Sequence, residues 1–335
     1  MATTQRKPPR TWSLLGEVKR RPNAYEATAA KFNYHFRREP APFEMDPQAP
    51  FNLYYLENRE GSPFNVEDWE GFRDPAKLAY SDYVMLQHDR ETYVDKLTDH
   101  HEAAESAATL DPAWVGTVRD LFVPLRFPMH VLQMVALYVG QMAPSAFITN
   151  CAHFQAADEL RRIQRIAYHT KALALAHDAT LAETATARGP WEKAPAWQPL
   201  REVLERLLAV RDWGEAFVAL NLAVKPAFDA VVHVQLSDLA SRAGDEYLSL
   251  LMAEFQLDAR RSQDWSAALV RYAVSQDAAM ADVVRGWLAT WQPLADAAVA
   301  GLAGIFAGAA RPMDATTVQQ AASAARQAVT DAAGL

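Results

Sequence analysis

The sequence predicts an all-α protein in which a helical bundle, residues 74–307, follows an irregular N-terminal arm, residues 1–73, and precedes an Ala-rich tail, residues 308–335. Asp-Pro pairs that start helices recur after residue 73, and long segments there place apolar residues at helical spacing. No stretch has the pattern of a β-sheet. Half of the residues are apolar (50%), which is enough for a substantial core in one large domain or two smaller ones.

The arm combines many prolines with many aromatic residues. Prolines prevent long helices, whereas a disordered tail is poor in aromatic rings, so this arm must pack on something. It either wraps its own helical domain or lies across a partner subunit, where aromatic residues anchor interfaces. Composition alone favours neither interpretation. The rings are Trp12, Tyr25, Phe32, Tyr34, Phe36, Phe43, Phe51, Tyr54, Tyr55, Phe64, Trp69 and Phe72.

Asp74 and Pro75 predict the start of the first long helix, over residues 75–104. An aspartate caps the free backbone N–H groups at a helix start, and proline is favoured at the first helical position. The buried side of this helix is expected to carry Leu78, Tyr83, Leu86, Tyr93 and Leu97.

Two further helices complete the first half of the bundle. One is expected over residues 112–143, where Asp111 and Pro112 repeat the starting signal and two later prolines should kink or divide the helix near Arg126. The next is expected over residues 145–178.

A Gly- and Pro-containing segment, residues 189–195, is expected to be a loop between the two halves. The second half then predicts helices near residues 196–211, 213–241, 243–277 and 279–307, with Pro226 bending the second of them. The tail has few large apolar residues and is expected to be either a loose helix or disordered.

Charge and cysteine content exclude several classes of function. The net charge of −8 argues against nucleic acid and anionic membrane as main partners. The single cysteine, Cys151, excludes internal disulfides, fits a reducing cytosol and is expected to be a buried, inert thiol. The first residues lack the apolar segment of a signal peptide, and no later run is expected to be apolar enough to span a bilayer. The chain is therefore expected to be cytoplasmic.

Glu159 is the main candidate for a metal ligand. In ferritin-like di-iron proteins, Glu-x-x-His sets a carboxylate and an imidazole on one face of a helix, both aimed into the bundle. The residue three places after Glu159 is Arg162, whose guanidinium stays protonated and offers no lone pair to a metal.

The frame of this motif occurs a second time. Asp258 and Arg261 repeat Asp158 and Arg161, as expected of an architecture built from two similar halves. The other four positions where such a fold places iron ligands hold Met129, Lys225, Ala259 and Ser262. One of six ligand positions is therefore filled by a competent group, whereas a pair of iron ions needs about four carboxylates.

The sequence thus predicts no catalytic, cofactor-binding or metal-binding residue in this chain. Glu159 and Arg162 are expected to form a buried ion pair instead, with Asp158 and Arg161 bonded to neighbouring helices. No Ser-His-Asp order, Cys-His pair or Gly-rich phosphate loop is present. The remaining candidates are expected to be a solvated helix end, His100, His101 and Glu102, and hydrogen-bonded histidines, His130, His153 and His169.

Several ordered stretches point to a known family. They are Arg10–Ser13, Arg21–Glu26, Pro124–Arg126, Gln141–Ser145, Ala156–Tyr168, Asp212–Phe217, Trp265–Val270 and Trp291–Asp296. On these stretches the chain resembles the beta subunit of the hydroxylase component of bacterial multicomponent monooxygenases, in the toluene and alkene monooxygenase branch. Only the tail after about residue 305 falls outside the resemblance.

The resemblance implies a ferritin-like, ribonucleotide-reductase-like bundle and a non-catalytic role. In that family the large alpha subunit holds the di-iron centre, and the beta subunit is a metal-free relative that supports a dimer of alpha–beta–gamma heterotrimers. A small effector protein docks on this dimer. Electrons come from NADH through a reductase and a Rieske ferredoxin, which carry FAD and iron–sulfur clusters, and the product is a hydroxylated aromatic ring or oxidised alkene. The resemblance also favours an arm that lies across a partner subunit.

Two other functions stay open at the level of sequence. The chain could be a divergent ferritin-like metal oxidase active on its own, or a helical scaffold without an oxygenase partner. The ligand count argues against the first, and a stable monomer would favour the second. The substrate, whether toluene, benzene, phenol or an alkene, and the residues that contact alpha are not determined by this sequence.

Overall fold

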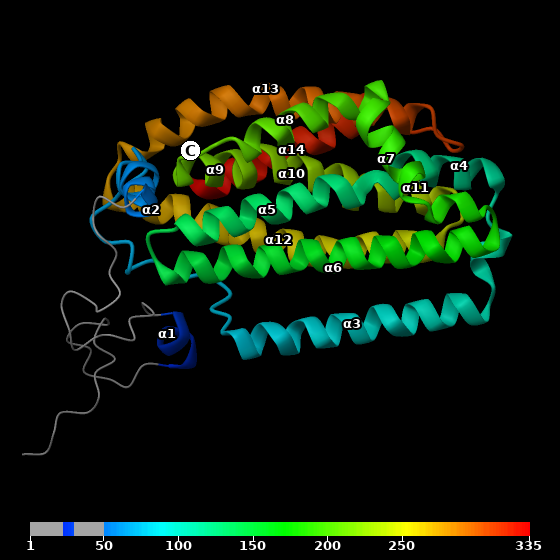
Figure 1. Cartoon of the computed structure of the whole chain (residues 1–335), viewed down its shortest axis with the longest axis horizontal. Coiled ribbons are helices and arrows are strands. Elements are labelled where there is room, and N and C mark those ends of the chain that lie inside the picture. Colours follow the sequence, from blue (N-terminus) through cyan, green and yellow to red (C-terminus); the bar gives the residue numbers. More distant parts are fainter. Residues whose placement is uncertain (1–22, 30–49) are drawn as a thin grey trace, which may run out of the picture.

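The computed structural model describes residues 23–29 and 50–335, and every regular element within them is a helix (Figure 1). The all-α prediction is confirmed. The resemblance stretch Arg10–Ser13, part of Arg21–Glu26, and several rings of the arm lie outside the described residues.

The described part of the first half of the chain forms two short N-terminal helices, four longer helices and the turns between them. In order they are α1 (Ala24–Ala29), α2 (Pro50–Tyr55), the π-helical turn η1 (Leu56–Glu60), α3 (Tyr80–Ala103), η2 (Ser106–Thr109), α4 (Pro112–Leu121), η3 (Val123–Leu125), α5 (Arg126–Met142) and α6 (Ala146–Ala176).

The second half contains one long interrupted helix and several regular ones. In order they are η4 (Ala179–Ala182), α7 (Thr184–Lys193), η5 (Pro195–Trp197), α8 (Gln198–Leu208), α9 (Trp213–Val218), η6 (Ala219–Val224), α10 (Lys225–Asp229), η7 (Ala230–Gln235), α11 (Leu236–Arg242), α12 (Glu246–Gln276), α13 (Met280–Ala307) and α14 (Ala315–Ala333).

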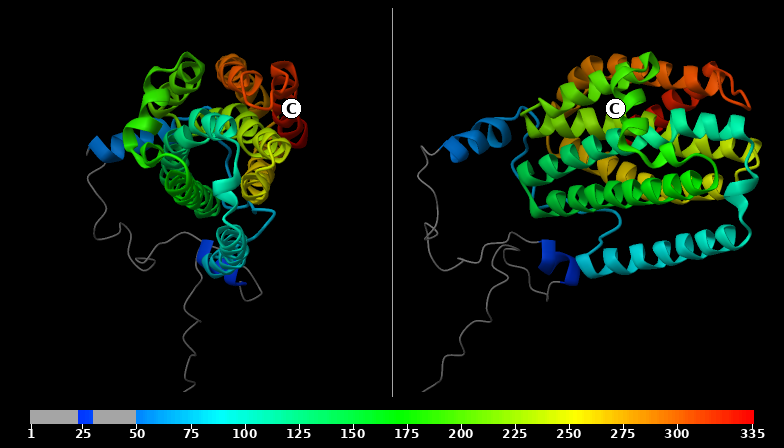
Figure 2. Two further views of the ribbon diagram at one scale, coloured as in Figure 1. Left: turned by 90° about the vertical axis from the view of Figure 1, so that its right-hand side faces the viewer. Right: turned by 45° about the vertical axis from the view of Figure 1, so that its right-hand side comes forward.

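The long helices lie side by side around one apolar core. α5 and α6 form a hairpin, α12 packs beside α6, and α13 with α8 covers the opposite side (Figure 1). The end-on view in Figure 2 shows α3 on the outside of this bundle rather than within its ring of helices. α3 contacts the bundle mainly through α12 and η2.

The first long helix begins later than its Asp-Pro signal predicts. The Asp74 carbonyl oxygen accepts a hydrogen bond from the Lys77 N–H at 3.1 Å, and its carboxylate accepts one from the Ala76 N–H at 3.1 Å, so Asp74 closes a turn. Lys77 has a φ of 50°, a left-handed conformation that interrupts a right-handed helix. Of the five residues predicted to be buried, only Tyr83 is fully so, because α3 contacts the bundle through a narrow face.

The predictions for α4, α5 and α6 are confirmed. The Asp111 carboxylate accepts a hydrogen bond from the Ala113 N–H at 2.8 Å and caps α4, which has proline at its start. Pro124 lies in η3, which divides the segment just before Arg126. Ser145 caps α6, so that helix begins within a residue of its predicted start.

The predicted loop over residues 189–195 is wrong. α7 continues through Gly189 and Pro190. Its Trp191 is buried and packs against Phe127, with ring centroids 6.2 Å apart, and against Trp197. Burial of this large ring outweighs the local preference of Gly-Pro for a turn.

The long helix after residue 212 forms as predicted, and Pro226 interrupts it. The chain stays helical from Trp213 to Arg242 but widens to π-helical turns in η6 and η7, the first of them just before the proline. A π-helical turn changes the local hydrogen-bond pattern of the helix, so the chain stays helical although proline has no N–H to donate.

The Ala-rich tail forms an ordered helix, α14, that packs on α10, α12 and α13. Asp314 caps it by accepting from the Thr316 N–H at 3.1 Å, and Gly334, with a φ of 78°, ends it. Val318 is fully buried, and Arg326 binds Asp296 at 2.6 Å. Small side chains let this helix lie close to its neighbours, which compensates for its few large apolar residues.

Several rings of the predicted arm pack on the bundle of the same chain. Phe64, Trp69 and Phe72 are buried, and the Phe64 ring lies 5.6 Å from that of Trp213. For these rings the expectation of a partner subunit is wrong, and the arm here covers its own helices.

Within residues 23–29 and 50–335, two helical stretches are long and apolar enough to cross a membrane, contrary to the prediction of none. They span Pro112–Met142 and Trp213–Arg242, and 67% and 94% of their most apolar windows are buried inside the protein. Their apolar residues therefore pack in the core, as in core helices of soluble bundles.

Candidate functional site

Three of the six predicted ligand positions, Glu159, Arg162 and Lys225, meet in the bundle interior within a group of ionisable side chains. We call Glu159, Arg162, Lys225, Asp229 and His233 the inner cluster; all five are buried. Glu159 and Arg162 come from α6, and the other three from the interrupted helix Trp213–Arg242. Asp229 and His233 follow Lys225 at intervals of four residues, so the three side chains share one face of their helix.

The predicted Glu159–Arg162 ion pair is confirmed, and Lys225 joins it. Glu159 Oε1 lies 2.5 Å from Arg162 Nη1 and 2.8 Å from Lys225 Nζ. Lys225 Nζ also donates to both carboxylate oxygens of Asp229, at 2.9 and 2.7 Å. Arg162 Nη2 donates to the Phe255 carbonyl oxygen of α12 at 3.1 Å. The two cations thus connect three helices.

The charges of the inner cluster balance. Burial by itself would raise the pKa of Asp229, but Lys225, His233 and Arg162 outweigh it and hold that pKa below its usual range. Burial lowers the pKa of His233, so its ring is neutral. His233 Nε2 lies 3.4 Å from Asp229 Oδ1. Two carboxylates therefore face two cations, which is the condition under which buried charges are tolerated.

The predicted bonds of Asp158 and Arg161 to a neighbouring helix are also confirmed. Arg261 Nη2 lies 2.5 Å from Asp158 Oδ2, and Arg161 Nη1 lies 2.9 Å from Asp258 Oδ2. The repeated Asp-x-x-Arg segments of α6 and α12 therefore exchange partners reciprocally, as expected when two antiparallel helices carry the same motif on facing sides.

Helix α3 adds a further set of hydrogen bonds to the same aspartates. Gln87 Nε2 donates to Asp158 at 2.9 Å and to Asp258 at 3.0 Å. Tyr83 donates to Asp158 at 2.9 Å, and Arg90 lies 2.5 Å from Asp258. We call Tyr83, Gln87, Arg90, Asp158, Arg161, Asp258 and Arg261 the outer network; it holds α3 to the bundle.

The two aspartates of the outer network differ in their protonation. Burial, and then the charge of Asp258, raise the pKa of Asp158 to about 7 against the opposing effect of Arg261. Burial would also raise the pKa of Asp258, but neighbouring arginines outweigh it and lower that pKa. The geometry supports this difference, because Asp258 contacts Arg90, Arg161 and Arg261.

The donor set of the inner cluster does not fit a pair of iron ions. Such a pair needs about four carboxylates and neutral imidazoles with free lone pairs. Here Arg162 and Lys225 already bind the carboxylates of Glu159 and Asp229, and their positive charges would repel a metal ion. No group of three or more His, Cys, Asp or Glu within residues 23–29 and 50–335 is arranged to hold a metal.

Asp229 and His233 were not identified from the sequence as partners of Glu159. A signal existed, because both lie at helical intervals from Lys225, which does occupy a predicted ligand position. The other positions hold residues without a charge: Met129, Ala259 and Ser262 are buried.

The remaining candidates lie apart from the inner cluster. His130 and His153 are exposed, and His100 is exposed in the last turn of α3. Cys151 is buried, and burial raises the pKa of its thiol well above the usual range, as expected for an inert cysteine. His101, Glu102 and His169 border a separate cavity.

Comparison with known proteins gives matches over most of the chain. Residues 54–277 match the family model described as Methane/Phenol/Alkene Hydroxylase. The chain is 40% identical over 299 residues to the hydroxylase component subunit beta of the toluene-4-monooxygenase system of Ectopseudomonas mendocina, and the match covers 89% of this chain and 90% of that protein.

Solved structures have the same fold. A chain in the structure of toluene 4-monooxygenase with toluene in its resting active site superimposes with a TM-score of 0.83 at 38% identity, covering 90% of this chain and 99% of that one. A chain of xenon-pressurised phenol hydroxylase from Pseudomonas sp. OX1 superimposes with a TM-score of 0.81 at 19% identity, covering 100% and 98%.

Proposed function

This chain belongs to the methane/phenol/alkene hydroxylase family, and from that premise we propose that it is the non-catalytic beta subunit of a di-iron hydroxylase complex that hydroxylates an aromatic ring or oxidises an alkene. The family resemblance and the ferritin-like bundle expected from the sequence are both confirmed. The relative in Ectopseudomonas mendocina is a subunit of a monooxygenase system, and this chain has the same role in its own system.

One observation carries the non-catalytic assignment: Arg162 and Lys225 bind Glu159 where iron ligands would be needed. A guanidinium cannot act as a ligand, and an ammonium engaged with two carboxylates has no lone pair to offer. The inner cluster therefore does structurally what metal ions do in a di-iron bundle, because two positive charges hold carboxylates from different helices together.

The chemistry then belongs to a partner. We expect a large alpha subunit with the di-iron centre, a gamma subunit, and a small effector protein that docks on a dimer of alpha–beta–gamma heterotrimers. A Rieske ferredoxin and an FAD-containing reductase would supply electrons from NADH. The complex is expected to be cytoplasmic, and its substrate is set by residues of the alpha subunit.

Exposed apolar side chains on α3 support a role in assembly. Tyr80 and Met85 are 71% and 68% exposed, and Val84 lies between them on the outside of the bundle. An apolar surface on a helix that stands at the edge of the molecule is typical of a protein that is covered by a partner. This feature favours a complex over a free-standing scaffold.

The iron content of the chain tests the proposal. We would purify the chain alone and, in parallel, together with the large subunit encoded beside it, and measure iron per chain by elemental analysis. Iron only in the copurified complex is the expected result. Stoichiometric iron in the isolated chain would contradict the proposal, because it would require ligands other than those of the inner cluster.

A further inference from the structure

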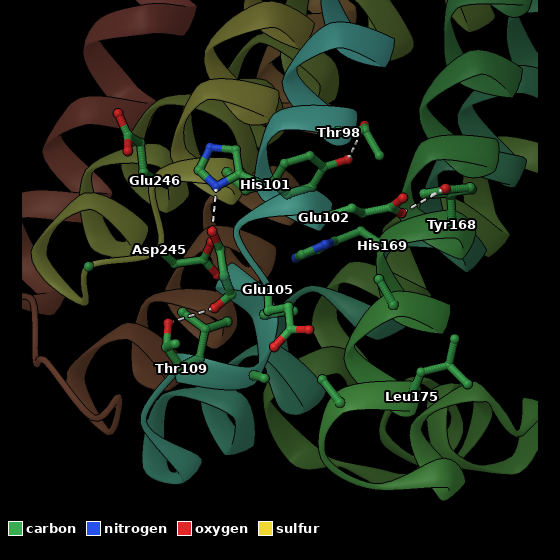
Figure 3. Close-up of a pocket in the computed structure, with 18 residues that line it drawn as sticks. Thr98, His101, Glu102, Glu105, Thr109, Tyr168, His169, Leu175, Asp245 and Glu246 are labelled. Atoms are coloured by element: carbon green, nitrogen blue, oxygen red, sulfur yellow. Dashed lines mark hydrogen bonds between the residues drawn. The ribbon is translucent and has the colours of Figure 1, made fainter.

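A cavity of about 540 Å³ opens where the C-terminal end of α3, the C-terminal half of α6 and the start of α12 meet (Figure 3). Its volume lies within the range of small-molecule sites, about 300–1,000 Å³. The turn η2 forms one of its walls. None of the inner-cluster residues lines it, so it is separate from the site described above.

Most of the wall is apolar. Ala107, Leu110, Ala172 and Ala176 present methyl and isobutyl groups, and the ring of Tyr247 covers one side. Such walls favour a ligand with a flat or compact apolar body.

Among the side chains that line the cavity, His169 has a buried ring nitrogen without a hydrogen-bond partner in the described part of the chain. Its ring is packed between Phe122 and Tyr247, with centroids 5.6 and 4.6 Å away, so its orientation is fixed. Nε2 is buried and makes no hydrogen bond to any residue that the structure describes. Figure 3 shows this ring pointing from α6 into the middle of the cavity. A buried polar nitrogen without a partner costs free energy, and a ligand hydroxyl would remove that cost.

The charges around the cavity limit the chemistry of its ligand. Glu102, Glu105, Asp245 and Glu246 line it without any lysine or arginine, so an anion would be repelled. Two of these carboxylates already have partners: Glu102 accepts from Tyr168 at 2.8 Å and Asp245 from the Trp114 indole at 2.9 Å. Burial lowers the pKa of His169, so its neutral ring can donate or accept one hydrogen bond.

We propose that this cavity binds a small neutral molecule with a flat aromatic body of one or two rings and a single hydroxyl group, and that the hydroxyl hydrogen-bonds to His169 Nε2. A fused-ring aromatic alcohol such as 2-naphthol meets these requirements. This assignment does not depend on the proposed role of the chain in a hydroxylase.

Binding of 2-naphthol to the full-length chain tests the proposal, with the intrinsic fluorescence of the ligand as readout. Naphthalene has the same body without the hydroxyl, and 2-naphthoate has the same body with a negative charge. We expect saturable one-site binding of 2-naphthol, weaker binding of naphthalene and none of naphthoate. Equal affinity for 2-naphthol and naphthoate, or the absence of saturable 2-naphthol binding, would overturn the proposal.

Two substitutions locate the site. His169→Phe keeps a ring between Phe122 and Tyr247. It should lower the affinity for 2-naphthol about 3- to 10-fold and leave the affinity for naphthalene unchanged, because only the hydrogen bond is lost. Ala172→Trp, at a half-exposed position of the wall, should lower the affinity for both ligands more than about tenfold, because the larger side chain fills the cavity. Leu208→Ala, at an exposed apolar residue of α8, is the control for adsorption and should change neither.

The results of these variants can each contradict the proposal. Equal weakening of both ligands by His169→Phe would exclude the hydrogen bond, and unchanged binding to Ala172→Trp would place the ligand elsewhere. Because Ala172 is half-exposed, that variant remains a test even where His169→Phe does not fold.

Discussion

Glu159→Ala should destabilise the chain strongly without changing the iron content of the complex. The substitution removes the carboxylate that Arg162 and Lys225 share, at 2.5 and 2.8 Å, and leaves Asp229 as the remaining carboxylate of the inner cluster. Arg162 then keeps a hydrogen bond to a backbone carbonyl but no bonded anion within the cluster.

The size of the effect follows from these contacts. Hydrogen bonds to charged groups contribute about 1.5–3 kcal/mol each, so the loss of two gives about 3–6 kcal/mol. Breaking one side of a buried ion pair costs about 3–5 kcal/mol. Lys225 retains both bonds to Asp229, which limits the loss, so we expect a decrease of about 3–5 kcal/mol in the free energy of unfolding.

Urea denaturation of the full-length chain measures this quantity. Tryptophan fluorescence and far-ultraviolet circular dichroism should give coincident transitions if unfolding is two-state. Glu202→Ala is the matched control, because Glu202 pairs with Arg206 in the same way at the surface, where their side chains are 55% and 59% exposed. That variant should change the free energy by less than about 0.5 kcal/mol.

A double substitution separates the loss of charge balance from the loss of packing. Glu159→Met with Lys225→Met removes one anion and one cation and keeps the volume filled, so it should be less destabilising than the sum of the two single changes. A Glu159→Ala variant within about 1 kcal/mol of wild type would refute the reasoning, as would the loss of iron from the complex.

Three further predictions concern the outer network and the tail. Tyr83→Phe removes the hydroxyl that donates to Asp158 and should lower the free energy of unfolding by about 1–3 kcal/mol, whereas Tyr80→Phe, on the exposed side of the same helix, should leave it unchanged in the same urea titration. In the folded chain the pKa of Asp158 is about 7, which is higher than the pKa of the same side chain in the unfolded chain. The stability that the protonated Asp158 side chain contributes is therefore complete below about pH 4 and is lost as the pH rises from there through 7. The stability advantage of wild type over Asp158→Asn, from urea titrations at pH 5 and pH 8, should therefore shrink by about 1–3 kcal/mol at the higher pH, and a constant advantage would mean that Asp158 does not titrate there. Val318→Asp should lower the free energy of unfolding by about 2–4 kcal/mol, because it buries a charge under α14. Gln319→Asp, one residue further on the exposed side of α14, should have the melting temperature of wild type in thermal unfolding. Equal melting temperatures for the two variants would show that α14 does not pack as described.

The sequence predicted what depends on neighbours along one helix. Asp111 and Ser145 cap α4 and α6 close to the predicted helix starts, because capping depends only on the side chain of the cap and the next few backbone N–H groups. The Glu159–Arg162 pair was predictable for the same reason, since residues three apart on a helix share a face. The residue types at three predicted iron-ligand positions, Arg162, Ala259 and Ser262, also showed directly that these positions hold no competent iron ligand.

Local signals failed where distant contacts compete with them. Asp74-Pro75 has the composition of a helix start, yet it closes a turn before α3. The Gly-Pro pair at residues 189–190 indicates a loop, yet burial of Trp191 keeps α7 helical. The Ala-rich tail lacks the large apolar residues of a core helix, yet it packs as α14 because its small side chains fit a surface formed by three other helices.

The sequence by itself thus determined the all-α class, most of the long helices, the family resemblance and the absence of an intact Glu-x-x-His motif. The tertiary structure decided that Asp158 binds Arg261 while Arg161 binds Asp258, that Asp229 and His233 join the inner cluster, and that His169 faces a cavity. Contacts within one helix follow from its fixed periodicity, whereas contacts between helices depend on their relative rotation and offset. Those two quantities are set by packing of the whole core, and no single segment of the sequence contains them.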